Sequence, residues 1–254
     1  MKMRYLLAWG VLSLATQVFG ECARWNTPDF FEAASLEQVV GCLAAEAGGN
    51  ARDAYGRTPL HYAALASTNP ALIAALIDAG ARVDARNEYS STPLHNAAQS
   101  STSPTIIEAL VAAGAEVDAR DGGGWTPLHD AAESNSDSAI VAALLAAGAR
   151  VNAREVNGWT PLHNAARSND NPAVIEALLA AGARVNARDG HSWTPLHFAA
   201  RFSSSPGVIA ALLDAGADAA ARDDDGKIPW DYAREREGLH GTDAYWRLNE
   251  GRFR

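Results

Sequence analysis

Apolar side chains along most of this chain fall at helical spacing, in short segments bounded by Pro and Gly. In the segment 173–181 the apolar residues recur three and four positions apart, which places them in one buried stripe of an amphipathic helix. Asn171 is a favoured N-cap, and Pro172 suits the first helical position, where its missing N–H costs nothing. Gly182 suits the left-handed conformation that ends helices. The sequence therefore predicts a helix over 172–181.

A shorter helix is predicted to precede this one. Thr160 is a favoured N-cap, Pro161 follows at the first helical position, and Leu162 and Ala165 share one apolar face. After the second helix, residues 185–189 lead extended into a turn and on to the next short helix.

The helix pair repeats every 34 residues. The motif Thr-Pro-Leu-His begins at Thr58, Thr92, Thr126, Thr160 and Thr194, with a degenerate copy at Ile228 and a shortened copy at Thr27. The second cap and the final glycine recur in the same register, at Asn69, Ser103, Asp137, Asn171 and Ser205 and at Gly80, Gly114, Gly148, Gly182 and Gly216. Because no single repeat can bury its apolar face alone, we expect the repeats to stack around a continuous core, in an all-α fold.

These motifs resemble the ankyrin repeat. The Thr-Pro-Leu-His-x-Ala-Ala start, the Leu-Leu-x-Ala-Gly-Ala end and the Val-Asn-Ala-Arg-Asp hairpin match that family over residues 25 to about 235. The resemblance implies a solenoid of stacked helix-turn-helix units with projecting β-hairpin loops. It also implies binding of another protein through the hairpin tips and the concave face of the first helices. The period is one residue longer than the usual 33, and the extra residue falls between the two helices.

The repeat pattern divides the chain into four parts. These are a signal peptide at 1–20, an N-terminal capping repeat at 21–53, five repeats at 54–223, and a C-terminal capping repeat with a tail at 224–254. Residues 45–49 depart from the repeat pattern, which marks the first repeat as a cap. Residues 242–249 are expected to form one more helical turn, with Tyr245 and Trp246 covering the last repeat.

The first twenty residues have the pattern of a secretory signal peptide. Lys2 and Arg4 precede a nearly continuous apolar run over 5–15, and Val18 and Gly20 stand at −3 and −1 to a cleavage after Gly20. The run is too short for a membrane-spanning helix, which needs about 20 residues, although an uncleaved anchor is the alternative. We expect the mature protein in the periplasm or outside the cell, with no membrane insertion after signal removal.

The charge argues against two classes of partner. The formal net charge is −9, and removal of residues 1–20 takes away two basic residues and leaves −11. A surface this acidic repels phosphate backbones and anionic lipid, so nucleic acid and membrane are poor partners. We expect a monomer. The mature chain has 18 arginines and the single Lys227, which together with the alanine content suggests a GC-rich bacterial genome.

Cys22 and Cys42 are the two cysteines, and both lie near the mature N-terminus. In an oxidising compartment such a pair usually forms a disulfide, which here would staple the N-terminal cap. Two buried thiols are the alternative.

Two ladders of like residues raise the question of metal or phosphate binding. His61, His95, His129, His163 and His197 recur once per repeat. Adjacent repeats lie about 10 Å apart and zinc binds nitrogen at about 2 Å, so neighbouring histidines cannot share an ion. The ankyrin resemblance implies instead that each histidine bonds the hairpin backbone.

The second ladder consists of arginines, each followed by an acidic residue or by asparagine. Its members are Arg52, Arg86, Arg120, Arg154, Arg188 and Arg222. A phosphate-binding stripe is one interpretation. The favoured interpretation is that the acid caps the turn while the arginine pairs locally or with the next repeat.

Two sets of positions are candidates for partner binding. The hairpin-tip residues before each Thr-Pro are Arg57, Ser91, Trp125, Trp159 and Trp193. Exposed tryptophan is typical of binding hot spots, although each indole could instead lie flat across the neighbouring hairpin. The variable positions on the first-helix face are Leu65, Gln99, Glu133, Arg167 and Arg201. Variation among copies is what a binding surface shows, and also what a neutral surface shows.

Catalytic motifs are missing from the sequence. It has no nucleophile beside a base, no phosphate loop and no metal-ligand spacing, so we expect no enzymatic activity, no cofactor and no metal site. The signal-peptide pattern and the ankyrin resemblance together imply an exported module that binds a protein partner, either in the cell envelope or as a secreted factor directed at a host. A metal-binding or catalytic protein, suggested only by the histidines, is a third hypothesis.

Overall fold

The computed structural model describes residues 22, 24–45, 48–251 and 253. The predicted signal peptide and its cleavage site lie outside the described residues. The chain divides into two compact units. The N-terminal unit holds the residues up to Ala97 together with Thr105–Ala115, and the C-terminal unit holds Ala98–Pro104 and the residues from Glu116 on.

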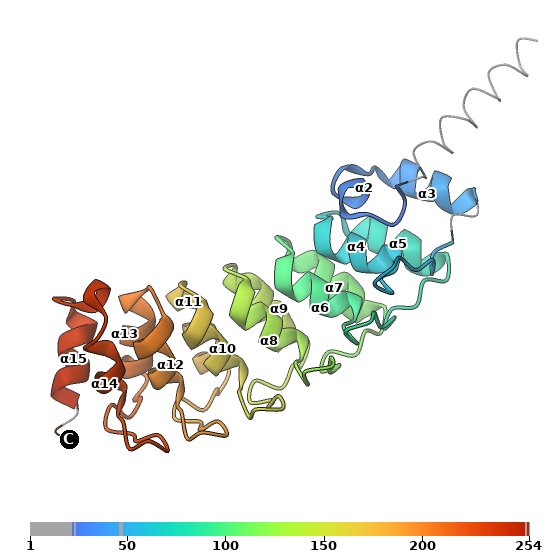
Figure 1. Ribbon diagram of the computed structural model, residues 1–254. Coiled ribbons are helices and arrows are strands. Elements are labelled where there is room, and N and C mark those ends of the chain that lie inside the picture. The colour runs from blue at the N-terminus through green and yellow to red at the C-terminus, as the bar shows by residue number, and fades with distance from the viewer. Residues whose placement is uncertain (1–21, 23, 46–47, 252, 254) are drawn as a thin grey trace, which may run out of the picture. The chain divides into compact units, whose positions relative to one another are not determined.

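The N-terminal unit consists of helix pairs that follow one another along the chain (Figure 1). These helices are α2 (Pro28–Ala33), α3 (Leu36–Ala44), α4 (Pro59–Ala66), α5 (Pro70–Asp78), and most of α6 (Pro93–Ser100) and α7 (Pro104–Ala112). Helix α2 packs against α4, and α3 packs against α5, so equivalent helices of neighbouring repeats lie side by side.

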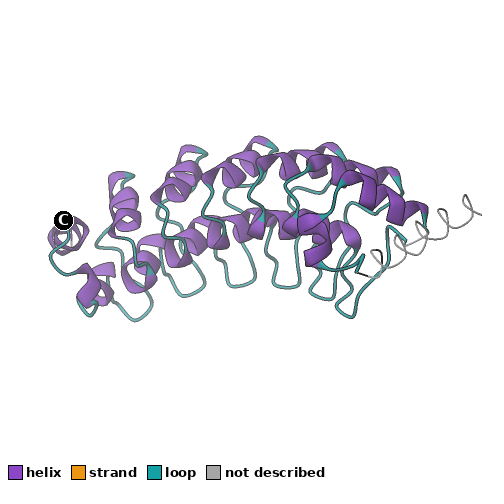
Figure 2. Ribbon diagram, turned by 90° about the horizontal axis from the view of Figure 1, so that it is seen from above, coloured by secondary structure: helices purple, strands orange, loops and turns teal. Residues whose placement is uncertain are grey.

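The C-terminal unit continues the same pattern. Its elements are α8 (Pro127–Ser134), α9 (Ser138–Ala146), α10 (Pro161–Ser168), α11 (Pro172–Ala180), α12 (Pro195–Phe202), α13 (Pro206–Asp214), α14 (Pro229–Ala233), the 3-10 helix η1 (Glu237–Leu239) and α15 (Asp243–Gly251). Helices α8, α10, α12 and α14 stack in one layer, and α9, α11, α13 and α15 stack in the other. The hairpins are the loops that join the second helix of one repeat to the first helix of the next, and they project on the side of the layer that contains α8 and α10 (Figure 2). This stacking of helix pairs is the all-α ankyrin-type solenoid that the repeat predicts.

The helices begin and end where the sequence indicates. Helix α11 begins at Pro172, where the Asn171 side chain accepts a hydrogen bond from the Ala173 N–H at 3.1 Å. Gly182 follows it with a φ of 88°, a conformation that a Cβ would penalise. Ser205 occupies the N-cap of α13 but makes no side-chain cap bond, so this helix start relies on Pro206 and the backbone.

An apolar core lies between the two layers. Leu162 of α10 and Ile175 and Leu178 of α11 are fully buried, and equivalent residues fill the other repeats. Ala165 and Ala166 are also fully buried, and their small size lets neighbouring first helices approach closely.

The hairpins are turns, and no described residue lies in a strand. Asp189 holds one of them, because its carboxylate accepts the backbone N–H groups of His191 and Trp193, both at 2.8 Å. The next link joins neighbouring hairpins: the Gly190 N–H donates to the Asn157 carbonyl oxygen at 2.9 Å.

The arginine ladder makes the local and inter-repeat bonds that we expected. The Arg188 guanidinium donates to the carbonyl oxygen of Ser192 in its own turn at 3.1 Å, and to that of Arg222 in the next repeat at 2.7 Å. Donation to the next repeat recurs at Arg52, Arg120 and Arg154. These arginines therefore tie consecutive hairpins together.

The N-terminal cap is closed by the predicted disulfide. Cys22 and Cys42 are bonded, with their Cα atoms 5.5 Å apart. In the same cap the rings of Trp25, Phe30 and Phe31 pack together with centroids between 5.0 and 5.5 Å apart. The cap thus combines a covalent staple with an aromatic core.

The C-terminal cap is helix α15, which packs on α13. Ala244 and Leu248 are buried, and the Tyr245 ring lies 4.5 Å from the ring of Trp230, so Tyr245 covers the last repeat as expected. The prediction for Trp246 is wrong, since this side chain is 52% exposed. It lies two residues from both Ala244 and Leu248, which directs it to the opposite face of the helix.

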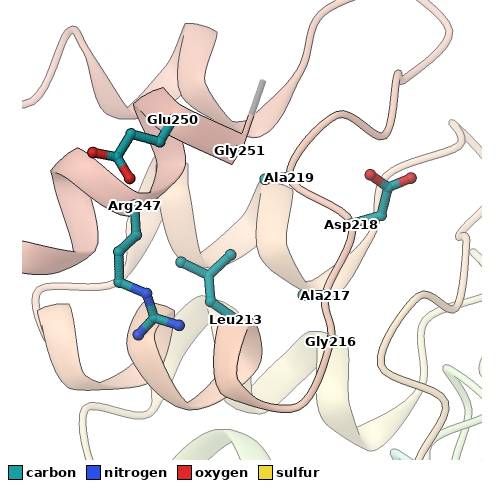
Figure 3. Close-up of a pocket in the computed structure, with 8 residues that line it drawn as sticks. All are labelled: Leu213, Gly216, Ala217, Asp218, Ala219, Arg247, Glu250 and Gly251. Atoms are coloured by element: carbon teal, nitrogen blue, oxygen red, sulfur yellow. The ribbon is translucent and has the colours of Figure 1, made fainter. Parts of the chain in front are cut away.

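A small hollow of about 330 Å³ lies between the end of α13 and α15 (Figure 3). Arg247 on its rim pairs with Asp214 at 2.7 Å. Gly251 approaches Ala219 so closely that a Cβ on the glycine would lie 2.5 Å from the Ala219 Cβ. These contacts fasten the cap helix to the last repeat.

Candidate protein-binding groove

The C-terminal unit carries an open hollow of about 620 Å³ where the hairpins meet the first helices. Five aromatic residues line it: Trp159, Trp193, Phe198, Phe202 and Tyr232. Three basic residues, Arg167, Arg201 and Lys227, also line it. We call this set of eight residues the aromatic groove.

The repeat places these side chains at equivalent positions of successive units. Trp159, Trp193 and Lys227 each precede the first residue of a short-helix motif, whereas Phe198 and Tyr232 follow the third helical residue of α12 and α14. Because neighbouring hairpins and neighbouring first helices lie side by side, residues 34 apart in the sequence become neighbours in space.

The aromatic rings contact one another across the repeats. The Trp159 ring lies 4.7 Å from that of Phe198, and the Trp193 ring lies 5.1 Å from Phe198 and 4.7 Å from Tyr232. The Trp159 indole N–H donates to the Asp189 carboxylate at 3.1 Å. The indoles of Trp159 and Trp193 therefore pack on the following repeat and also line the groove, while their role in binding a partner stays a prediction.

The basic side chains lie over these rings. The Arg167 guanidinium carbon is 5.2 Å from the Trp159 ring centre, and that of Arg201 is 5.3 Å from Phe202 and 5.4 Å from Tyr232. Such cation–π contacts are worth about 0.5–1 kcal/mol each at exposed sites. They hold the long side chains in place while leaving the guanidinium edges free to donate.

The charges of the groove are only partly paired. Arg167 lies 3.5 Å from Glu133, while Arg201 and Lys227 have no carboxylate of the described residues within 4.0 Å. On the hairpin side, the Asp189 carboxylate accepts hydrogen bonds from three N–H groups. The exposed Asp225 stands at the hairpin tip. The helix side of the groove is therefore positive, in a chain whose net charge is negative.

The groove brings together four of the predicted partner-binding residues, namely Trp159, Trp193, Arg167 and Arg201. Glu133 is at its edge through the pair with Arg167. Arg57, Ser91, Trp125 and Gln99 do not line it, and their role in binding stays a prediction. Arg57 lies over the ring of Tyr55, 5.2 Å away, and Gln99 is exposed beside a separate shallow hollow.

Phe198, Phe202, Tyr232 and Lys227 were not predicted as groove residues. A signal for two of them exists, because the position after each histidine changes from polar in the middle repeats to aromatic in the last ones. Its occupants are Tyr62, Asn96, Asp130, Asn164, Phe198 and, after the degenerate motif, Tyr232.

A model of the family described as ankyrin repeats in three copies matches residues 64–155 and 128–223, which is more than half of the chain. The chain belongs to the ankyrin-repeat family. A comparison with curated proteins found no match. Ankyrin repeats suggest a module for protein–protein interaction, and proteins of this family are typically not catalytic.

The histidines of this ankyrin array link each first helix to the following hairpin. The His163 Nδ1 accepts the Thr160 N–H at 3.1 Å, which places its proton on Nε2, 3.2 Å from the Trp193 carbonyl oxygen. Equivalent bonds join His61 to Ser91, His129 to Trp159 and His197 to Lys227. The predicted hairpin role is confirmed for these four residues.

Burial keeps these imidazoles neutral. It lowers the pKa of His61, His129 and His163 to about 4, and it also lowers the pKa of His197. Among the described residues, no group of three or more His, Cys, Asp or Glu side chains is placed to hold a metal ion. No helix in the described part of this ankyrin-repeat chain has the length and apolar character needed to cross a membrane.

Two polar residues of the first helices are largely buried, and their side chains make no hydrogen bonds in the described part of the chain, which is unfavourable for the folded state. Burial, followed by the nearby Asp121 and Glu133, raises the pKa of Asp130 well above its ordinary value. Asn164 is fully buried, and within the described residues neither atom of its amide makes a hydrogen bond. Asp130 and Asn164 each directly follow a histidine. Phe198 holds the equivalent position, two repeats after Asp130 and one repeat after Asn164.

Proposed function

We propose that this ankyrin-repeat chain is an exported module that binds another protein through the aromatic groove and the adjoining hairpin tips. The observation that carries the proposal is the pair Trp159 and Trp193, both half-buried against Phe198 in a groove that exposed arginines also line. Trp and Arg are the residues most enriched at the energetic centres of protein interfaces.

The groove is organised before any partner arrives. Trp159 is fixed by its bond to Asp189 and its contact with Phe198, and Arg201 is held over two rings. Side chains that are already ordered lose little conformational freedom on binding, which favours affinity for a given contact area.

Export is the second part of the proposal. It is supported by the basic and apolar pattern of residues 1–20 and by the Cys22–Cys42 disulfide, since disulfides persist in oxidising compartments. The partner would then be a protein of the cell envelope or of the cell's surroundings.

Affinity capture tests the binding site. The mature chain serves as bait on envelope extract, in the original form, as the double variant Trp159→Ala with Trp193→Ala, and as Trp246→Ala. Trp246 is an exposed tryptophan outside the groove and is the matched control. We expect a protein that is recovered by the original chain and by the control, and lost from the double variant.

Loss of capture must not result from unfolding, because both tryptophans pack on Phe198. Circular dichroism of each bait checks this, and Arg201→Glu offers a second groove variant at an exposed side chain. Equal capture by all baits would overturn the groove as the binding site. Fractionation of cells separates a periplasmic protein from a secreted one that acts on a host.

A further inference from the structure

The chemistry of the aromatic groove specifies the kind of protein segment that fits it. The inference rests on the proposed function, and concerns the charge and composition of the bound segment. The groove concentrates positive charge on its helix side, although the chain as a whole has a net charge of −9.

The positive groups of the groove are available to a ligand. Arg201 and Lys227 have no carboxylate partner within 4.0 Å among the described residues, and both side chains are exposed. Arg201 lies over Phe202 and Tyr232, and Lys227 lies over Tyr232 at 5.3 Å. Stacking on a ring occupies the face of a guanidinium, so its N–H edge can still form two parallel bonds with a carboxylate.

The apolar part of the groove lies directly beside these charges. The Trp193 indole N–H makes no hydrogen bond within the described residues, and Phe202 is 44% exposed. An exposed phenylalanine between two arginines leaves apolar surface that an apolar side chain of a ligand can cover. The recognition element is therefore a carboxylate next to an apolar or aromatic group.

We propose that the aromatic groove binds an acidic peptide segment of the partner protein, in which Asp or Glu side chains flank an aromatic or aliphatic residue. The carboxylates pair with Arg201 and Lys227, with Arg167 as a further donor, and the apolar side chain packs on Trp193 and Phe202. Asp225 at the hairpin tip repels the acidic groups and so fixes which side of the groove they occupy.

The net charge of the chain does not prevent this binding. Interactions between exposed charges are screened beyond about 8 Å at physiological ionic strength, so the nearby basic groups act on a short peptide more strongly than distant acids. A long polyanion such as nucleic acid or a sulfated polysaccharide would extend past the groove and meet the acidic surface. A short peptide fits the size and the charge of the site better.

Peptide selection on the mature chain tests the inference. Random peptides of about twelve residues are displayed and selected on the immobilised chain, and the most enriched peptide is synthesised in two forms, one with its Asp and Glu replaced by Asn and Gln. We expect the enriched peptides to hold Asp or Glu next to an apolar residue. The neutral form should bind at least ~10-fold more weakly, and the affinity of the acidic form should fall as salt is raised.

Variants of the protein locate the effect. Arg201→Gln should weaken the acidic peptide at least ~5-fold and leave the neutral form unchanged, which is the signature of a direct charge pair. Arg184→Gln removes an exposed arginine outside the groove and should change neither affinity.

The outcomes separate this inference from the proposed function. Enriched peptides that lack acidic residues but need Trp159 and Trp193 would overturn the inference and keep the binding groove. Peptides that bind equally well to the Trp159→Ala, Trp193→Ala variant would overturn both. An absence of enriched peptides, equal effects of the two arginine variants, or stronger groove binding of heparin than of any peptide would also overturn the inference.

Discussion

The imidazole of His163 donates from Nε2 to the carbonyl oxygen of Trp193, 30 residues further along the chain, while its Nδ1 accepts the N–H of Thr160. One neutral side chain thus supports the start of its own helix and the hairpin that carries a groove tryptophan. A protonated ring would lose the Nδ1 acceptor, so the structure of the groove depends on the charge state of a buried residue.

Acidification should therefore destabilise the chain. The folded-state pKa of about 4 for His61, His129 and His163 lies below the ordinary 6.5, so between these values the unfolded chain binds more protons. The contribution of these histidines to the free energy of unfolding is complete above pH 6.5. It is lost as the pH falls toward about 4, by on the order of 3 kcal/mol per histidine. The raised pKa of Asp130 acts in the opposite direction. Denaturant titrations at about pH 7 and about pH 4.5 measure the loss.

A variant identifies the histidines as the cause. In His163→Gln the change in unfolding free energy between the two pH values should be smaller than in the original chain, because one titrating group is gone. An unchanged pH dependence would contradict the assignment.

Replacement of Asp130 by Asn should stabilise the protein at neutral pH. The Asp130 carboxyl group makes no hydrogen bond or ion pair within the described residues, and burial raises its pKa, so its ionised form is costly in the folded state. The equivalent residue Asn96 shows that the position accepts an amide, whose N–H donates to the His61 carbonyl oxygen at 3.4 Å. We expect a gain of about 1 kcal/mol in unfolding free energy.

The gain from Asp130→Asn has a defined pH dependence. A raised folded-state pKa means that the cost exists when the carboxyl is ionised, so the gain should be complete at high pH and vanish as the pH falls below the ordinary value of 3.8. Thermal unfolding at several pH values measures this, and a gain that stays constant down to low pH would point to another cause.

Loss of the disulfide should loosen the N-terminal cap. The Cys22–Cys42 link closes a loop with a sequence separation of 20, for which chain entropy predicts about 3 kcal/mol of stabilisation. Hydrogen exchange of the cap amides in the double variant Cys22→Ser, Cys42→Ser should speed up, and the C-terminal unit should not change. Two free thiols in denatured, unreduced protein would show that the link does not form.

A methyl group at Gly251 should weaken the C-terminal cap. The added Cβ would lie 2.5 Å from that of Ala219, closer than real contacts allow, so the end of α15 must shift. We expect Gly251→Ala to destabilise the cap by about 1 kcal/mol, measured by thermal unfolding. Gly238→Ala is the matched control, because nothing lies within 4 Å of its added Cβ. Equal unfolding temperatures for the two variants would contradict the close contact.

The repeat made most of the fold predictable from the sequence. The starts of helices α10 and α11 and the left-handed Gly182 follow from local chemistry that recurs in several copies, whereas the hairpin bond of His163 was implied by the ankyrin resemblance. The disulfide was also predicted, because the chain offers one possible pair.

The groove was only half predictable. Trp159, Trp193, Arg167 and Arg201 stood out as exposed or variable positions, whereas Phe202 occupies a place that holds small residues in earlier repeats. Trp125 has the same sequence context as Trp159 but does not line the groove, because Asp130 and Asn164 replace the aromatic residues beside it. Which of several equivalent positions form a site depends on neighbours one repeat away, and this pairing requires the packed structure.

The arginine ladder links equivalent positions of successive repeats, which bears on how the number of repeats can change in evolution. Arg52, Arg120, Arg154 and Arg188 each bind the carbonyl group of the residue 34 positions later, which is itself an arginine. Because donor and acceptor occupy the same place in successive copies, a gene that gained or lost thirty-four codons would still encode a bonding partner for every such arginine. Evolution can therefore adjust the length of the array in whole copies, whereas insertions of other sizes would interrupt the ladder.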